Sequence, residues 1–491
     1  MGPTSHKVTP GQLDANRLGA AIQALEGVKG AAESLGAELD GRLVLASTKD
    51  NEYHAARDRC FWLNDAGYPA VIAKVASVED VQKVVKAATS CLKELKLAVY
   101  CGGHTAMSMV DDALVVDMSG LNSVDVDTDA KRATVGGGCR IQDVDKALEG
   151  TGLGFVTGTN GDTGVSGLTL AGGFGYLGRQ HGFACDNVLE AQVVLASGEV
   201  VIASDSGPHK ELMQGLRGGG GNFGIVTRWV FRLHDVSNCF GGLVVRFAPT
   251  WSASVGSLKK WRDGVKDLPT PVMSAVALPG RAPVNVYLGV TFEEGGKDAK
   301  SATELKGLKF TQNLGGWFGL ENSLKKRDHC TDAQKMLEPM NQPCYRLVSG
   351  IALANMSDDL IEKIITLVRK DCPTKHCVML LFKMGGNANS PDSPPSVLSH
   401  RGADFWILTE GGWAKNSSQR TVQKVEEWML LVKQTLMACD GYDLPYPMWD
   451  NIHSADTPDA HQAYGGAIKK FMLETKQKYD PSNIFSYNKN I

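Results

Sequence analysis

The sequence predicts a protein of two domains that mixes helices and strands, and three observations support this prediction. The chain has 491 residues, which is long for a single hydrophobic core and leaves room for one domain to interrupt the other. Strand and helix patterns alternate from Pro69 onward. Glycine clusters fill the first half and become sparse from about His234, so we place a domain boundary between residues 234 and 242.

The first regular unit is a strand, a helix and a second strand. The apolar run at 70–75 predicts the first strand, and Ser77, with Asp80 three residues later, predicts the start of a helix. One face of this helix should lie in the core because its apolar residues recur at helical spacing: Val78, Val81, Val84, Val85 and Ala88. KLAVY (96–100) predicts the second strand, so the GGH turn at 102–104 follows a strand end.

Further elements are predicted on both sides of the boundary. Before it we expect strands at 113–119, 131–138 and 225–233, a hairpin at 186–204 that turns at Ser197-Gly198, and short helices at 141–152 and 209–217. After it we expect strands at 243–248 and 284–292, a helix at 357–370 and a loop at 387–396.

Composition excludes several classes of protein. The formal net charge of −3 gives no electrostatic footprint for nucleic acid or a membrane surface, and no apolar run is long enough to span a bilayer. The 11 cysteines lack metal-ligand spacing, so we expect no metal site and mostly free thiols. The first residues lack a signal-peptide pattern, which leaves a cytoplasmic protein, or a secreted one whose signal has been removed.

Residues 158–182 carry nine glycines in 25 positions, a density too high for the interior of a helix or strand. Apolar residues interleave with these glycines, which is unlike a flexible linker. Two interpretations stay level at this point: a buried loop around an extended polyanionic ligand, or a run of tight surface turns.

The GGH turn allows two interpretations as well. Glycines at a strand end let backbone N–H groups approach an anionic ligand, and a neighbouring histidine could touch that ligand. A plain turn with a partly buried histidine is the alternative, which residues 101–109 taken alone favour.

Taken together, five blocks resemble the flavoprotein oxidases of the vanillyl-alcohol oxidase superfamily, most closely the berberine-bridge-enzyme-like branch. The blocks stand in the order found in that family and cover most of residues 66–236 and the C-terminus: GGH (102–104), VVDMSGLNSV (115–124), the glycine-rich stretch 164–194, LRGGGGNFGIVT (216–227) and YDPSNIFSYNKNI (479–491). One such block is weak evidence, whereas five in order are strong.

The resemblance implies an α+β, two-domain PCMH-type FAD-binding fold with an inserted substrate domain, in which helices cover an antiparallel sheet. We expect an N-terminal segment at 1–65 and an FAD-binding domain at 66–236. A substrate-binding domain should follow at 237–452, and the C-terminal segment 453–491 should return to the FAD domain.

The resemblance also implies FAD as the cofactor. His104 matches the histidine that is commonly bonded to the 8α-methyl group of FAD, and Asn160 stands where many members carry a second, cysteine link, so we expect one covalent bond. Gly102, Gly103 and Thr105 would face the pyrophosphate. Further residues expected to bind FAD are Gly164, Ser166, Gly167, Thr169, Gly172, Gly173, Gly175, Gly220, Asn222, Gly224 and Asn488.

The expected catalytic residues are Glu410, Tyr446 and Asn451. Glu410 lies in a stretch that resembles the family strand carrying a catalytic base, although an ungapped count selects Thr409, and a surface glutamate at a strand end is an equal alternative. Many members have a tyrosine where this chain has Trp449, which cannot accept a proton. Asn451 is kept, and Tyr446 or His453 would supply the polar group.

The implied activity is that of an FAD-dependent oxidoreductase that moves a hydride from an alcohol, sugar or specialised metabolite to flavin N5. The partners are then a small-molecule substrate and oxygen or another electron acceptor, with no nucleic acid and no membrane span. Two alternatives stay open: a flavin-binding protein that has lost oxidative turnover, and an oxidative cyclase of the same branch.

Overall fold

The computed structural model describes residues 10–61, 66–293, 298–307, 319–337, 345–440, 442–445, 466–488 and 490–491. Among these residues, no helix combines the length and the apolar character needed to cross a membrane.

The N-terminal half begins with a four-stranded sheet in the order β1-β2-β4-β3. β2, β4 and β3 run parallel, and β1 pairs antiparallel with β2. The strands and the helices that cover them are β1 (Arg42–Leu45), β2 (Val71–Lys74), β3 (Lys96–Tyr100), β4 (Ala113–Asp117), α1 (Pro10–Glu38), α2 (Asn51–Arg57) and α3 (Val78–Thr89). Ser77 caps α3 as predicted, because its hydroxyl accepts from the backbone N–H of Asp80.

A second sheet of five antiparallel strands has the order β5-β6-β10-β8-β9. The predicted hairpin is present as β8 and β9, and Gly198 at its turn has a φ of 80°. The strands and nearby elements are β5 (Val124–Asp127), β6 (Arg132–Gly136), β8 (Val188–Val194), β9 (Val200–Ala203), β10 (Ile225–Arg232), α4 (Ile141–Leu148), α7 (Lys210–Leu216) and the small pair β7 (Leu153–Gly154) and β11 (His234–Asp235).

The second half forms a nine-stranded antiparallel sheet with the order β15-β12-β14-β13-β18-β19-β17-β20, and β16 pairs with β12. Its strands are β12 (Phe240–Phe247), β13 (Val272–Pro279), β14 (Val284–Thr291), β15 (Gly319–Asn322), β16 (Lys325–Lys326), β17 (Tyr345–Leu353), β18 (Val378–Lys383), β19 (Phe405–Trp413) and β20 (Tyr442–Pro445). Its helices are α8 (Trp251–Gly264), α9 (Lys300–Gly307), α10 (Asp358–Thr366) and α11 (Gln419–Met437).

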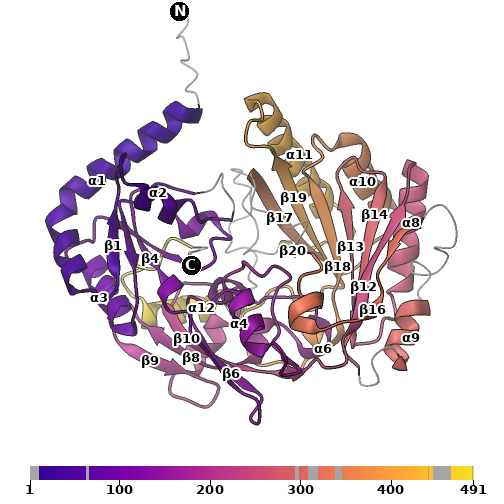
Figure 1. The fold of residues 1–491 in the computed structure, drawn as a ribbon, viewed down its shortest axis with the longest axis horizontal. Coiled ribbons are helices and arrows are strands. Elements are labelled where there is room, and N and C mark those ends of the chain that lie inside the picture. Colours follow the sequence, from indigo (N-terminus) through magenta and orange to yellow (C-terminus); the bar gives the residue numbers. More distant parts are fainter. Residues whose placement is uncertain are drawn as a thin grey trace, which may run out of the picture.

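The two faces of the large sheet pack against different partners. Met379 and Leu381 of β18 lie in a core shared with α8, α10 and α11, whereas Leu380 and Phe382 lie in a core shared with the N-terminal half. Side chains alternate between the faces of a strand, so each strand supplies both cores. Figure 1 shows these helices on the outer side of the sheet, away from the N-terminal sheets.

The chain end returns to the N-terminal half through α12 (Gly466–Tyr479), which packs against α7. The buried Lys476 Nζ of α12 donates to the carbonyl of Asn222 at 2.8 Å and to the carboxylate of Asp480 at 2.8 Å. This contact fixes the tail beside the loop that carries the predicted glycine cluster at 218–221.

One local expectation is wrong. The glycine-rich stretch contains two helices, α5 (Val165–Leu170) and α6 (Gly178–His181), although we expected its glycine density to exclude helix. Both helices are short, and glycines stand at their ends: Gly164 is the N-cap of α5, and Gly182 ends α6 with a φ of 83°. Most of the stretch is buried, which favours the buried-loop interpretation over surface turns. The proposed domain limits stay a prediction.

Candidate functional site

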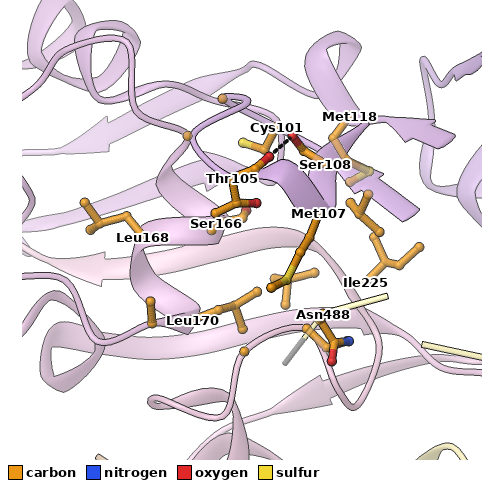
Figure 2. Close-up of a pocket in the computed structure, with 18 of the residues that line it drawn as sticks. Cys101, Thr105, Met107, Ser108, Met118, Ser166, Leu168, Leu170, Ile225 and Asn488 are labelled. Carbon is orange, nitrogen blue, oxygen red and sulfur yellow. Dashed lines mark hydrogen bonds between the residues drawn. The ribbon is translucent and has the colours of Figure 1, made fainter. Parts of the chain in front are cut away.

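The larger cavity lies where the two N-terminal sheets meet the returning tail, and its volume is about 190 Å³. Most of its lining comes from four segments: β3 with the GGH turn, α5 (Val165–Leu170), the loop into β10 and the tail near Asn488. In Figure 2, Met107, Leu170, Ile225 and Asn488 come from different segments and surround a common space.

Close backbone packing shapes this cavity. A Cβ atom at Gly102 would overlap the backbone nitrogen of Gly164, and a Cβ atom at Gly164 would overlap the backbone nitrogen of Gly102. Gly103 has a φ of 72°, a left-handed conformation that favours glycine. The two glycine turns therefore touch along their backbones, and they bring the GGH turn against the start of α5.

The walls suit a flat, largely apolar group with a charged end. Val99 and Tyr487 are both 37% exposed and both line the cavity. A bound group would therefore cover apolar surface that is exposed to solvent in its absence. Among the described lining residues there is no lysine or arginine. Anion binding here would rest on backbone N–H groups, which are free of intrahelical partners in the first turn of a helix such as α5.

The tail contributes Asn488 to the same cavity. Its Nδ2 donates to the carbonyl of Gly221 at 3.1 Å and to that of Phe485 at 2.8 Å. Its Oδ1 is buried without a hydrogen-bond partner among the described residues. An acceptor fixed in this way fits a donor on a bound group.

His104 stands on the wall between two cavities. It lines the larger cavity and also a smaller one of about 50 Å³. Its ring stacks on Phe61 with centroids 4.1 Å apart and planes 14° apart. Burial lowers the pKa of His104 to about 3, so the imidazole is neutral at pH 7 and keeps a lone pair for bond formation.

The smaller cavity joins the two halves of the chain. The N-terminal half supplies Phe61, His104, Gly158, Thr159, Asn160, Thr163, Leu168 and Phe174, and the large sheet supplies Leu380, Phe382, Trp406, Leu408 and Glu410. The rings of Phe382 and Trp406 stack with centroids 5.0 Å apart. Most of this lining is aromatic or aliphatic, and Glu410 is its carboxylate.

Strand alternation aims Glu410 into the smaller cavity. Trp406, Leu408 and Glu410 are alternate residues of β19 and all line it, whereas Thr409 belongs to the other alternation and is absent from the lining. The structure thus separates the two candidates left by the sequence count. Glu410 is also 4% exposed, which excludes the alternative of a surface glutamate.

Arg346 of β17 forms an ion pair with Glu410, and both side chains are buried. The two residues lie on neighbouring strands because Val348 is the register partner of Glu410, and Arg346 is the partner of Gly412. Burial raises the pKa of Glu410 above its ordinary value, and the guanidinium opposes that shift only in part. This arrangement can hold a carboxylate that accepts a proton more readily than an exposed glutamate does.

The structure gathers most of the residues predicted to bind the cofactor. The larger cavity is lined by Gly102, Gly103, His104, Thr105, Gly164, Ser166, Gly167, Gly220, Gly224 and Asn488. Five of the predicted residues lie outside that lining: Thr169, Gly172, Gly173, Gly175 and Asn222. Asn222 instead donates to the carbonyl of Gly219 at 2.7 Å within the loop. Tyr446 and Asn451, with Trp449 and His453, lie outside the described residues.

Several lining residues were missed by the sequence analysis. Phe382 and Trp406 line the smaller cavity, and Arg346 pairs with the lining residue Glu410. None of the three was selected from the sequence, and alternation along their strands is the one signal that could have selected them. Leu97, Val99 and Cys101 alternate along and beyond β3 in the same way. Tyr487 follows the predicted tail block closely, yet nothing in the sequence indicates that its side chain faces a cavity.

Comparisons with known proteins agree with this geometry. Residues 69–204 match the model of a family described as the FAD binding domain. An FAD-linked oxidoreductase of Dictyostelium discoideum is 28% identical over 430 residues, covering 86% of this chain and 88% of that protein. The (R)-6-hydroxynicotine oxidase of Paenarthrobacter nicotinovorans is 34% identical over 227 residues, covering 45% of this chain and 49% of that protein.

A solved structure, the berberine-bridge-enzyme-like protein 1 of Physcomitrella patens, superimposes with a TM-score of 0.77. The match covers 92% of this chain and 97% of that chain at 22% sequence identity. The predicted fold, two parts with an antiparallel sheet covered by helices, is therefore confirmed.

Proposed function

We propose that this chain is an FAD-linked oxidoreductase of the berberine-bridge-enzyme-like branch and that it oxidises a small, largely apolar alcohol or amine in its smaller cavity. FAD would occupy the larger cavity. The observation that carries the proposal is the position of His104, which lines both cavities, so that a flavin bonded to it would lie next to the space that contains Glu410.

The larger cavity fits the cofactor. FAD is a flat ring system joined to a pyrophosphate, and the cavity offers apolar walls at Val99 and Tyr487 with closely packed glycine turns at Gly102 and Gly164. When bound, FAD accepts a hydride at N5 and passes two electrons to oxygen or to another acceptor. His104 would hold it, through a covalent bond from its neutral imidazole to the 8α-methyl group.

Glu410 would take a proton from the substrate. A hydroxyl or amine placed in the smaller cavity can donate to this carboxylate while the adjacent carbon loses its hydride. Arg346 acts on Glu410 rather than on the substrate: its guanidinium lowers the pKa of the carboxyl group against the effect of burial and would fix its direction. The apolar side chains that line the cavity with Glu410, among them Phe382 and Trp406, would limit the access of water.

The lining favours an apolar substrate over a sugar. A sugar carries hydroxyl groups on every face, and each would need a polar partner once it is buried. The large sheet offers this cavity Glu410 and four apolar side chains, namely Phe382, Trp406, Leu380 and Leu408. The N-terminal half adds a few polar side chains, which are Thr159, Asn160 and Thr163. The nicotine oxidase named among the relatives is an enzyme that acts on such a molecule, which supports the proposed class.

The test is anaerobic reduction of the purified, flavin-loaded protein, followed by its visible absorbance. We expect aromatic and aliphatic alcohols or cyclic amines to bleach the flavin and oligosaccharides to leave it oxidised. Bleaching by sugars alone would overturn the substrate class. A flavin that dithionite reduces but that neither group of compounds reduces would favour the alternative of lost turnover. A product that contains a new ring would favour an oxidative cyclase.

A further inference from the structure

Two cysteines of the large-sheet half lie at the ends of one short turn. Cys372 and Cys377 flank Pro373–His376, between the helical turn η7 (Leu367–Asp371) and β18. Both cysteines are buried, whereas Lys375 and His376 between them are exposed. The thiols are free, and their side chains are hydrogen-bonded to each other.

Thr374 holds both sulfur atoms on the same side of the turn. The thiol of Cys372 donates to the carbonyl of Thr374 at 3.0 Å, and the Sγ of Cys377 lies 3.4 Å from the Thr374 hydroxyl. That hydroxyl in turn donates to the carbonyl of Gly412 in β19 at 2.6 Å. The turn therefore holds both sulfur atoms within hydrogen-bond distance of Thr374.

Electrostatics make the two thiols unequal. A hydrogen bond with Cys372 lowers the pKa of Cys377 below its ordinary value, although burial opposes the shift. The same bond raises the pKa of Cys372, and burial adds to that effect. Arg281 lies alongside and donates to the carbonyl of Cys372 at 2.6 Å. Cys377 is therefore the more acidic thiol of the pair, and Cys372 is the less acidic one.

We propose that Cys372 and Cys377 form an oxidisable dithiol that closes to a disulfide under peroxide. The Cys377 thiolate attacks one oxygen of hydrogen peroxide, its O–O bond breaks, and the products are a sulfenic acid and hydroxide, which takes up the Cys372 proton to become water. The Cys372 thiolate then attacks the sulfenic sulfur; the S–S bond forms, the S–O bond breaks, and hydroxide leaves, which takes up a proton from the solvent to become the second water. Two thiols are oxidised, and one peroxide is reduced to two waters.

The disulfide would fasten the turn to the strands that it supports. Cys377 precedes Val378, whose register partner in β19 is Glu410, and Thr374 is bonded to Gly412 two residues further along that strand. A disulfide across the turn reduces the number of conformations that this segment can adopt in the unfolded chain. We therefore expect the oxidised protein to unfold at a higher temperature than the reduced protein.

The experiment is peptide mapping of the folded, flavin-loaded protein, with and without treatment by hydrogen peroxide. After the treatment, the thiols that are still free are alkylated, and the protein is then digested. Trypsin cuts after Lys370, Lys375 and Lys383, so the disulfide would join two separate peptides, 371–375 and 376–383. We expect the joined pair after peroxide, its release by dithiothreitol, and a higher melting temperature while it is joined.

Cys91 is exposed and serves as the internal standard for oxidation. If peroxide oxidises Cys91 while both turn peptides are recovered alkylated, the proposal is overturned. It is also overturned if the joined pair forms only after the protein is unfolded. Cys377→Ser must abolish the joined pair, whereas Cys91→Ser must leave it. These outcomes are read by mass and do not depend on turnover, so they stand apart from the proposed activity.

Discussion

Arg346 and Glu410 form a buried ion pair across β17 and β19, on the face of the large sheet that meets His104 and the smaller cavity. Two buried charges are expensive to desolvate unless they are paired, and a hydrophobic pair of similar volume would often serve stability as well. Retention of a charged pair beside the proposed flavin site is thus better explained by proton transfer than by packing.

Replacing Glu410 tests its proposed role. Glu410→Gln keeps the size of the side chain and an oxygen for Arg346 but removes the proton acceptor. We expect kcat to fall by about 10²–10⁴-fold with flavin content unchanged, which is the usual contribution of a general base. Stopped-flow reduction of the bound flavin measures this directly.

Thr409→Val is the matched control, because Thr409 is the neighbouring residue and points away from the smaller cavity. Its rate of flavin reduction should stay close to that of the wild type. If both variants reduce flavin equally slowly, the loss of rate would come from a disturbed strand rather than from the missing Glu410 carboxylate.

The pH dependence of kcat/KM should have its acid limb above the ordinary range of a glutamate. The pKa of Glu410 is raised by burial, and the carboxylate is the active form, so the rate falls as the pH drops through that pKa. Arg346→Gln removes the charge that lowers this pKa. Its acid limb should therefore move to still higher pH, and a limb that stays in place would argue against coupling between the two residues.

Gly102→Ala should abolish the cofactor site. The added Cβ would overlap the backbone of Gly164, so the two turns must separate. We expect a protein with little bound flavin and a lower melting temperature. Gly256→Ala in α8 is the control: its Cβ meets nothing within 4 Å, and alanine stabilises a helix interior by about 1 kcal/mol relative to glycine. Absorbance of the purified variants distinguishes the two outcomes.

Arg179 should be needed to join the two halves. Its guanidinium is buried and donates to the carbonyls of Val272 and Leu268, each at 2.7 Å, and to that of Met384. Arg179→Met would leave these acceptors without a donor, and each buried unpaired group costs about 1–3 kcal/mol. We expect denaturant unfolding to show a loss of about 3 kcal/mol or more. An unchanged midpoint would show that water replaces the guanidinium.

Much of the N-terminal half could be predicted because its signals are local. Ser77 begins a helix by capping it, Gly198 permits a hairpin turn, and the glycine blocks carry the resemblance that implied FAD. The short helices α5 and α6 were missed, because glycine content argues against helix and only the packing of their ends explains why they form.

The substrate side could be predicted only in part, because its residues meet through strand register. Glu410 was proposed on resemblance, and its direction follows from alternation along β19 with Trp406 and Leu408. Its partner Arg346 lies 64 positions earlier, and their contact depends on the pairing of β17 with β19. The sequence around Arg346 or Glu410 does not indicate that β17 pairs with β19.

The most direct test of the account is the absorbance of the purified protein before and after acid precipitation, with the pellet examined under ultraviolet light on a denaturing gel. We predict that flavin colour and fluorescence stay with the wild-type chain. The His104→Ala variant should release its flavin into the supernatant or bind none. Colour released from the wild type would remove the covalent role of His104. A wild-type protein that holds no flavin, even after incubation with FAD, would contradict the account.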